Sequence, residues 1–280
     1  MDLFVMIGLP GSGKSTLAKE IAEEKNALII STDAIRKGYS ITNPFPVARE
    51  MFITYMQTGR NVVYDATNLT TKNRTAALEM AKKFGYETTA VVMLTPLDKC
   101  YEQNRKREDV VPDDVIDKFL RRFEYPYEGE FDHIKPIQTG ISIFEAEDIN
   151  QESIHHSHTL LEHLRMTGDA VKKITKDEHL IEAAYNHDIG KPITKTHINS
   201  KGEETEHAHY YGHENAGAYL WFTSREWSED AEETGRLINY HMRPYVWAKS
   251  EKAIRKDKER FTEKFITQLT ILHMGDEEAH

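Results

Sequence analysis

The chain has 280 residues, of which 39% are hydrophobic and 29% are charged, a composition that predicts a folded globular protein and excludes a disordered one. This length exceeds the usual size of one hydrophobic core, so two domains are expected. The formal net charge of −10 argues against a broad grip on a nucleic-acid duplex, while contact with one strand end stays open. The short apolar runs and the single cysteine, Cys100, predict a cytoplasmic protein that does not contact membranes.

Short apolar runs in the first half predict strands that are buried on both faces. They occupy residues 3–7, 27–30, 61–65 and 88–94. Between them, two groups of apolar residues have helical spacing: Leu17, Ala18, Ile21 and Ala22, and Ala76, Ala77 and Met80. This alternation predicts an α/β domain with helices on both faces of a parallel sheet.

A glycine-rich segment, GLPGSGKST, follows the first expected strand directly and satisfies the whole G-x-x-x-x-G-K-[ST] pattern. The backbone of such a loop surrounds phosphate oxygens, with Lys14 at the terminal phosphates and Ser15 on Mg²⁺. The alternative is a tight turn before an ordinary helix. We expect ATP to bind at Gly8, Gly11, Ser12, Gly13, Lys14, Ser15 and Thr16.

Charged residues near the ends of the next strands indicate how an acceptor could bind. In STDAIRKG, Asp33 could accept a hydroxyl proton or could cap a helix, and Arg36 could hold a phosphate of the acceptor. Asp65, in VVYDATN, could order Arg36 or a magnesium-bound water. In CYEQNRKREDVVP, Arg107 precedes a helix that starts at Pro112, as in a mobile lid, and the alternative is solvated surface charge.

In this order, GLPGSGKST, STDAIR, VVYDATN and NRKREDVVP resemble the bacteriophage polynucleotide 5′-kinase family over about residues 1–130. The resemblance implies catalytic roles for Lys14, Asp33, Arg36 and Arg107, with Asp33 as general base on a 5′-hydroxyl and Arg107 as the lid arginine, which also contacts ATP. It implies acceptor contacts from Asp33, Arg36, Asp65 and Arg74, with Arg36 at the 3′-phosphate. Gln103 stands where the family often has another arginine. Kinases of small metabolites share much of this pattern.

The second half differs in chemistry, because 13 of the 14 histidines lie between His155 and His280. Histidine is the commonest protein ligand of transition metals. An acidic stretch without periodicity, residues 144–151, is the expected linker between domains at 1–145 and 152–280. Beyond it the apolar spacing is helical, with no strand alternation, which predicts an all-α domain.

Several of these histidines and two aspartates share apolar helix faces. His187 and Asp188 follow Leu180 and Ala184, and Asp276 shares a face with Leu269 and Leu272. Such buried polar side chains need compensation, which a divalent cation supplies. For one histidine alone, a hydrogen-bonded core residue is the simpler interpretation.

Together, HTLLEH, NHDIGKP, YYGHENAG, INYHMRP and LHMGDEE resemble the HD phosphohydrolase superfamily over about residues 152–280. The resemblance implies a first metal at His163, His187, Asp188 and Asp276, and a second at His213 and His241. His158 competes with His163 for the first position. Asp188 would bridge one or two divalent ions (Mn²⁺, Ni²⁺, Co²⁺ or similar) that activate a water, and Lys191 could stabilise negative charge.

The pairing resembles bacterial RNA end-healing enzymes with the module order reversed. It implies ATP-dependent phosphorylation of 5′-OH ends and removal of 2′,3′-cyclic phosphate or 3′-phosphate from single-stranded RNA or DNA, with an RNA ligase acting downstream. The alternatives are a small-metabolite or nucleoside kinase fused to a nucleotidase, and a nucleotide-sensing regulator whose second domain does not hydrolyse.

Overall fold

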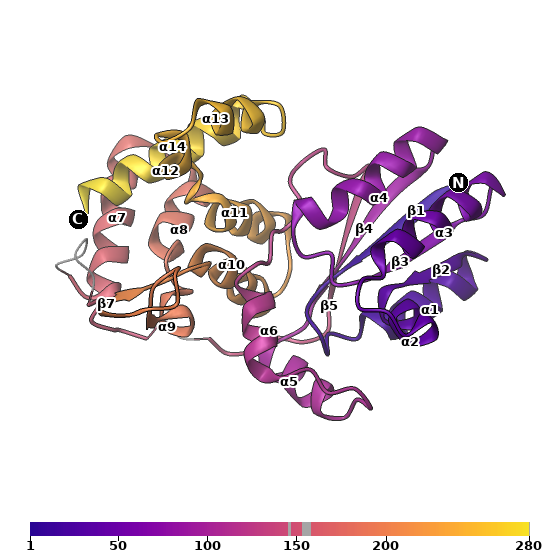
Figure 1. Ribbon diagram of the computed structural model, residues 1–280. Coiled ribbons are helices and arrows are strands. Elements are labelled where there is room, and N and C mark those ends of the chain that lie inside the picture. The colour runs from indigo at the N-terminus through magenta and orange to yellow at the C-terminus, as the bar shows by residue number, and fades with distance from the viewer. Residues whose placement is uncertain (145–146, 153–157, 280) are drawn as a thin grey trace. The chain divides into compact units, whose positions relative to one another are not determined.

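The computed structural model describes residues 1–144, 147–152 and 158–279, which divide into two compact units. The first unit comprises Met1–Phe119 and Gly129–Gly140, and the second comprises Leu120–Glu128 and Ile141–His280 (Figure 1). The expected linker at 144–151 includes residues 145–146, which lie outside the described part. Among the described helices, none is long and apolar enough to cross a membrane.

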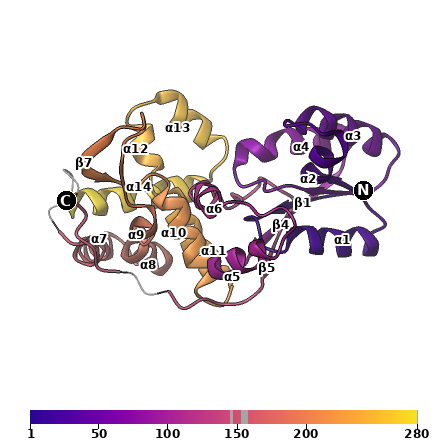
Figure 2. The ribbon, with the colours of Figure 1, turned by 60° about the horizontal axis from the view of Figure 1, so that its bottom comes forward.

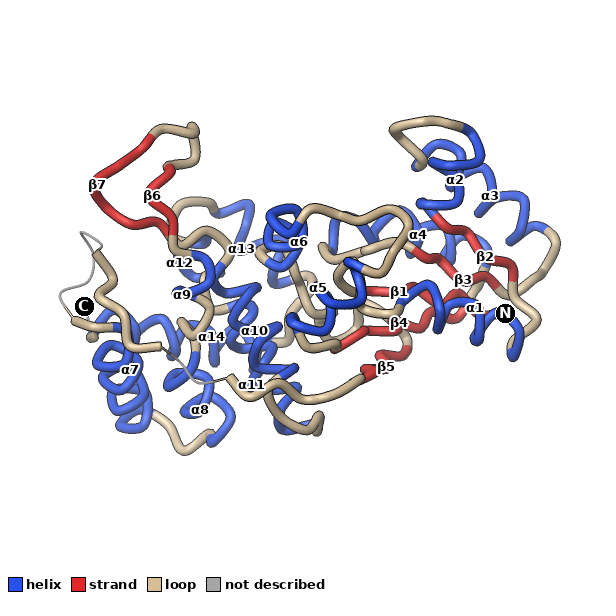
Figure 3. Tube along the Cα trace, turned by 90° about the horizontal axis from the view of Figure 1, so that it is seen from below, coloured by secondary structure: helices blue, strands red, loops and turns tan. Residues whose placement is uncertain are grey.

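The described residues of the first unit form a five-stranded parallel sheet with the order β2-β3-β1-β4-β5 (Figure 3). Its strands are β1 (Asp2–Ile7), β2 (Leu28–Ser31), β3 (Val62–Asp65), β4 (Glu87–Leu94) and β5 (His133–Gln138). The register pairs Leu3 with Val62 on one side and with Thr88 on the other. This result confirms the expected α/β fold, and β5 adds a strand that the apolar runs did not predict.

Helices cover both faces of this sheet (Figure 2). The helices of the first unit are α1 (Lys14–Glu24), α2 (Thr32–Tyr39), α3 (Phe45–Gln57), α4 (Thr71–Phe84), α5 (Leu97–Arg105) and α6 (Asp113–Leu120), of which α1 and α3 pack on opposite faces. Ala18 and Ala22 of α1 pack on Met6, Val63 and Val91 of one face. On the other face, Phe52 of α3 lies edge-on to Tyr64, with ring centroids 5.0 Å apart.

The second unit is mainly helical, and it also contains one antiparallel hairpin. Its elements are α7 (Leu160–Ile174), α8 (Glu178–Asn186), α9 (Lys191–Thr194), β6 (Thr196–Ile198), β7 (Glu204–His209), α10 (His213–Thr223), α11 (Glu229–Tyr240), α12 (Arg243–Trp247), α13 (Glu251–Lys258) and α14 (Glu263–Glu278). The domain is helical as expected, and the hairpin is an addition that the apolar spacing did not predict. Most of its side chains are at least partly exposed, so its sequence lacks the apolar alternation that marks a half-buried strand.

A short segment within the range expected for the first domain belongs to the second unit. We call Leu120–Glu128 the strap. Phe123 and Tyr125 are fully buried, and their rings contact Tyr219 and Phe222 of α10 at centroid distances of 5.0 and 4.5 Å. Burial of these two rings explains why the strap belongs to the second unit, so that the boundary between the units is not a single position near residue 145.

Candidate active sites

The glycine-rich loop joins β1 to α1 and requires glycine for steric reasons. Gly11 has φ of +78°, and a Cβ atom there would lie 2.1 Å from the carbonyl oxygen of Cys100. Lys14 Nζ donates to the carbonyl of Leu9 at 2.9 Å. Burial lowers the pKa of Lys14, and the charges of Asp65 and Asp33 oppose that shift. The ammonium group is thus held against the loop, where a phosphate group would supply a stronger partner.

Several further charged or hydroxyl side chains share a cavity of about 620 Å³ with Lys14. Asp33 accepts from Arg36 at 2.8 Å with one oxygen and from Arg107 at 3.4 Å with the other. The structure therefore brings together Lys14, Ser15, Asp33, Arg36, Asp65 and Arg107, whose roles were expected from the sequence. Gly11, Gly13 and Thr16 line the same cavity, whereas Ser12 is buried and the amide of Gly8 donates to Thr67 at 3.1 Å.

The carboxylates of this cavity are fixed by the start of α2. Ser31 is the N-cap of that helix, because its hydroxyl accepts from the amide of Ala34. The same hydroxyl donates to Asp65 at 3.2 Å. Asp33 lies in the first turn, so it does not cap the helix, and its carboxylate is left to face Arg36 and Arg107.

Arg74 does not join this group, which corrects its expected contact with the acceptor. Its guanidinium is completely buried and makes a bidentate ion pair with Glu130 at 2.7 and 2.8 Å. It also donates to the carbonyl of Asn68 at 3.1 Å. Because a buried guanidinium requires such partners, Arg74 supports the cavity-lining Asn68 rather than a substrate.

The loop between α5 and α6, which was expected to be a lid, is held together at its base by a side chain that the sequence did not reveal. Asn104 is fully buried, its amide donates to the carbonyl of Val111 at 2.7 Å, and its oxygen accepts from the amide of Val111 at 3.1 Å. Helix α6 begins directly after Pro112, as expected. Arg107 lies in the loop that Asn104 closes, and Gln103 also lines the cavity.

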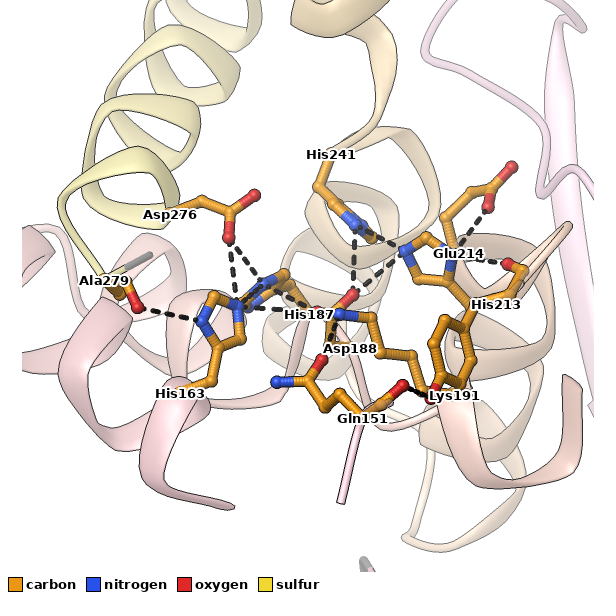
Figure 4. Close-up of polar contacts among 12 residues, drawn as sticks. Gln151, His163, His187, Asp188, Lys191, His213, Glu214, His241, Asp276 and Ala279 are labelled. Carbon is orange, nitrogen blue, oxygen red and sulfur yellow. Dashed lines mark hydrogen bonds and ion pairs between the residues drawn. The ribbon is translucent and has the colours of Figure 1, made fainter. Parts of the chain in front are cut away.

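In the second unit, six side chains that were expected to bind metal converge from the ends or interiors of different helices (Figure 4). They are His163 of α7, His187 and Asp188 after α8, His213 at the start of α10, His241 after α11 and Asp276 of α14. All six are buried. They form two groups, and within each group the possible ligand atoms lie within 4.8 Å of one another. The groups are His163, His187 and Asp276, and Asp188, His213 and His241.

The four imidazole rings are oriented by backbone carbonyls. Nδ1 of each ring faces one carbonyl oxygen: Ala279 for His163 (3.4 Å), Ala184 for His187 (2.9 Å), Tyr210 for His213 (2.7 Å) and Ile238 for His241 (2.8 Å). A carbonyl only accepts, so Nδ1 carries the proton and a neutral ring directs its Nε2 lone pair inward. The Nε2 atoms then meet in pairs, at 3.3 and 3.2 Å.

Asp188 belongs to the second group but directs one carboxylate oxygen to each of the two histidine pairs. Its Oδ1 is 2.9 Å from His213 Nε2 and 3.6 Å from that of His241. Its Oδ2 is 3.5 and 3.4 Å from the Nε2 atoms of His163 and His187. Facing lone pairs beside two buried carboxylates need positive charge between them, so this donor set fits divalent ions.

The two carboxylates also shift the pKa values within the cluster and favour protonation of His187. Burial lowers the pKa of His187, but the charges of Asp188 and Asp276 outweigh it and raise the pKa to about 10. Burial raises the pKa of Asp188, yet Lys191 and the imidazoles hold it well below its ordinary value. A bound cation would take the place of such a proton, as at other imidazole sites.

Partners of the cluster include residues that sequence reasoning did not single out. Tyr245 donates to Asp276 at 2.8 Å. Lys191 contacts Asp188 at 2.5 Å and donates to Gln151 at 2.6 Å. The sequence carries no signal for Tyr245 and Gln151, because their contacts join positions 31 and 40 residues apart.

Four side chains of the cluster line an open cavity of about 1060 Å³: Asp188, His213, His241 and Asp276. Its walls include Tyr210, Tyr211 and Tyr245, together with the exposed Lys249. Tyr211 is 45% exposed, and its ring stacks on His209 at 5.4 Å with an angle of 10°. The cavity is therefore large and aromatic enough for a ligand much bigger than a phosphate group.

The structure distinguishes the two candidates for the first histidine. His163 lies in the cluster, whereas His158 is 3.9 Å from Glu162 and its side chain is 38% exposed. His155 and His156, which precede the HTLLEH motif, lie outside the described residues. Thr159 caps α7 in a capping box with Glu162, and this fixes the turn that precedes His163.

Comparison with known families agrees with both units. Residues 3–126 match the family model described as an AAA domain, and residues 154–272 match the HD domain. The chain thus joins an N-terminal P-loop kinase fold to a C-terminal helical HD domain, and this confirms the fusion inferred from the motifs.

Two curated relatives each match 44% of this chain. The L-seryl-tRNA(Sec) kinase of Methanococcus maripaludis is 27% identical over 141 residues, which are 44% of this chain and 53% of the relative. A protein of Autographa californica nuclear polyhedrosis virus, proposed to be a bifunctional polynucleotide kinase/RNA ligase, is 30% identical over 146 residues, which are 44% of this chain and 21% of that protein. The chain therefore spans about half of one relative and about a fifth of the other. The crystal structure of a fungal RNA kinase has 18% identity and a TM-score of 0.37, covering 65% of this chain and 93% of that one.

Proposed function

We propose that the first unit transfers a phosphate from ATP to the 5′-hydroxyl of a polynucleotide. The observation that carries this proposal is the cavity in which the P-loop Lys14 and Ser15 face Asp33 with its two arginines. Phosphoryl transfer needs a positioned base and positive charge on the transferred group, and this cavity contains both. Both curated relatives are named as kinases, and both names refer to an RNA or a polynucleotide.

The residues of the cavity would divide the reaction between them. Asp33 would accept the hydroxyl proton, and Arg36 would bind a phosphate of the acceptor. Lys14 and Arg107 would neutralise the transferred phosphoryl group, while Ser15 would hold Mg²⁺. Arg36 and Arg107 both contact Asp33 in the protein alone, so a bound acceptor and donor would draw the two guanidinium groups onto phosphates.

For the second unit, we propose metal-dependent hydrolysis of a 2′,3′-cyclic phosphate or a 3′-phosphate. Support comes from four inward-facing Nε2 atoms and the bridging position of Asp188. Divalent ions bound there would supply a water of lowered pKa and stabilise charge on the phosphorus oxygens. Lys191, beside Asp188, would add a positive charge to the cavity, and Tyr211 would offer a face on which a terminal base could stack.

The two reactions together would convert broken single-stranded ends into ends that a ligase can join. We infer RNA as the substrate, because hydrolysis of a 2′,3′-cyclic phosphate requires a 2′-oxygen. ATP, Mg²⁺ and one or two divalent transition metals would be the cofactors, and an RNA ligase would act on the product.

The kinase proposal is tested with an RNA oligomer that carries a 5′-hydroxyl and γ-labelled ATP. Asp33→Asn should lower kcat by about 10²- to 10⁴-fold, the usual contribution of a general base. Asp98→Asn serves as the control, because the Asp98 side chain of α5 does not line the cavity. Preferred phosphorylation of nucleosides or sugars, with the oligomer inert, would refute a polynucleotide acceptor.

The hydrolase proposal is tested with the same oligomer ending in a 3′-phosphate or a 2′,3′-cyclic phosphate, in the presence of Mn²⁺. Release of phosphate or opening of the ring should persist in Asp33→Asn and be lost in Asp188→Ala. Tight metal binding without turnover of these ends or of bis(4-nitrophenyl) phosphate would contradict hydrolysis and favour a binding function.

A further inference from the structure

The strap, Leu120–Glu128, is fixed in the second unit by two buried aromatic side chains. Phe123 lies edge-on to Tyr219 at an interplanar angle of 85°, and Tyr125 stacks on Phe222 at 30°. Tyr240 also donates its hydroxyl to the carbonyl of Tyr125 at 2.8 Å. The backbone of the strap is thereby held as firmly as a core element.

Two asparagines connect this backbone to the HD helices. Asn239, which is 3% exposed, accepts from the amide of Tyr125 at 2.6 Å and donates to the carbonyl of Phe123 at 2.9 Å. Asn239 also donates to Asn215 Oδ1 at 2.9 Å, and Asn215 donates to the carbonyl of Arg121 at 2.9 Å. The network needs both a donor and an acceptor on each side chain, which an amide alone provides among side chains of this size.

Both asparagines lie beside ligands of the second candidate metal. Asn215 follows His213 by two residues at the start of α10, and Asn239 precedes His241 by two residues at the end of α11. Gly212, the N-cap of α10, lies so close to the strap that a Cβ atom would be 2.3 Å from the carbonyl oxygen of Arg121. The strap therefore contacts the two helix ends that present His213 and His241.

We infer that Asn215 and Asn239 are positioning residues that hold His213 and His241 at the separation required by the second metal ion. This inference rests on the proposed metal-dependent function of the second unit. The two Nε2 atoms are 3.2 Å apart, and their rings are oriented by carbonyls of the same backbone segments. A small relative shift of the helix ends changes ligand distances, and metal sites tolerate only about 0.2 Å. His163, His187 and Asp276 belong to other helices and would keep their ion.

The test measures metal binding by the full-length Asn239→Asp variant. This change preserves volume but removes the amide that donates to Phe123 and Asn215. Calorimetric titration with Mn²⁺ should show one ion bound as in the wild type and the second weakened by about 10- to 100-fold, the usual effect of losing an outer partner of a ligand. The EPR spectrum should change from that of a coupled Mn²⁺ pair to that of isolated ions.

Leu237→Ala is the matched control. Leu237 is fully buried in the same helix, so this variant loses stability without removing a hydrogen bond to the strap. It should keep two ions of wild-type affinity at a temperature where it is folded. If Asn239→Asp does not fold, Asn215→Ala, which removes one donor to the strap, should give the same selective loss.

Two results would overturn the inference. One is unchanged binding of both ions by the asparagine variants, and the other is equal weakening of both ions. A wild-type protein that binds no ion would instead contradict the proposed function itself, so the two failures are distinguishable.

Discussion

Arg74 and Glu130 form a completely buried ion pair in the first unit, and this predicts a large loss of stability when one partner is removed. Glu130→Ala would leave the guanidinium buried without its carboxylate, at a cost of about 3–5 kcal/mol in the free energy of unfolding. Urea denaturation followed by circular dichroism measures the change. Replacing both residues, Arg74→Met with Glu130→Leu, should recover much of the loss because no buried charge remains.

An exposed ion pair provides the comparison. Asp114 and Lys118 are also joined at 2.8 Å, but both side chains are mostly in solvent. Asp114→Ala should leave the denaturation midpoint almost unchanged, because water and salt screen such a pair. An equally small effect for Glu130→Ala would mean that Arg74 is not held in the way that its buried contacts indicate.

Tyr211 tests whether the HD cavity recognises a base. Its exposed ring is stacked on His209 and lines the cavity above the metal cluster. Removing an aromatic ring on which a base stacks costs about 1–3 kcal/mol, so Tyr211→Ala should raise KM for a 3′-phosphorylated oligomer by roughly 5- to 150-fold. Turnover of bis(4-nitrophenyl) phosphate should not change, and Tyr211→Phe should restore the wild-type KM.

At the residue scale, the sequence predicted those polar, metal-ligating side chains that lie on the apolar face of a helix. His187 and Asp188 follow the apolar face of α8, so their burial could be inferred from spacing alone. Glu130, Asn104 and Tyr245 could not be found in this way, because each acts through a contact that only the tertiary fold creates. Arg74 was misassigned for the same reason.

At the element scale, the apolar runs predicted β1 to β4 and missed β5, one of the two edge strands of the sheet. β1, β3 and β4 are continuous apolar runs in the middle of the sheet. Among the described strands, β5 pairs with β4 alone. It is partly exposed and contains Pro136, so its sequence resembles a loop. The β6–β7 hairpin has little buried surface and was missed for a similar reason.

The packing of the turn after α8 against α10 gives a prediction at this scale. A Cβ atom on Gly190 would lie 2.2 Å from the carbonyl oxygen of His213 and 2.5 Å from the amide nitrogen of Gly217. Gly190→Ala should therefore push α10 away from Asp188 and weaken Mn²⁺ binding. It should also lower the free energy of unfolding by about 1–3 kcal/mol, and the thermal midpoint should fall with it. Calorimetry measures both effects.

Gly38 provides the control for this steric effect. Its added Cβ atom would meet no heavy atom within 4 Å, and Gly38 is not in the left-handed region. Gly38→Ala should leave metal binding unchanged and keep or raise the thermal midpoint, because alanine favours a helix. A Gly190→Ala variant as stable and as metal-rich as Gly38→Ala would contradict the close approach of α10.

At the scale of the whole molecule, the motifs distinguished the two domains but did not locate the strap. Its sequence, LRRFEYPYE, starts at the last residue of α6 without a glycine-rich or polar linker, so nothing in it marks a change of unit. The position of the strap depends on how well Phe123 and Tyr125 fit the surface of α10 and on the asparagine network, and neither has a local pattern.

Amide hydrogen exchange, measured with and without each ligand, tests whether the strap belongs to the second unit. A ligand that binds only the folded state stabilises it by RT ln(1 + [L]/Kd), about 2.7 kcal/mol at 100 times Kd, and slows exchange in the unit that holds its site. Mn²⁺ should protect α7, α8, α10, α11 and α14, and also residues 120–128, although these start at the last residue of α6. An ATP analogue with Mg²⁺ should protect residues 8–16 and α2. In Asp188→Ala, the protection by Mn²⁺ should disappear from residues 120–128 while that by the ATP analogue persists. Protection of the strap by the ATP analogue, with no response to Mn²⁺, would assign this segment to the first unit and contradict its role at the metal cluster.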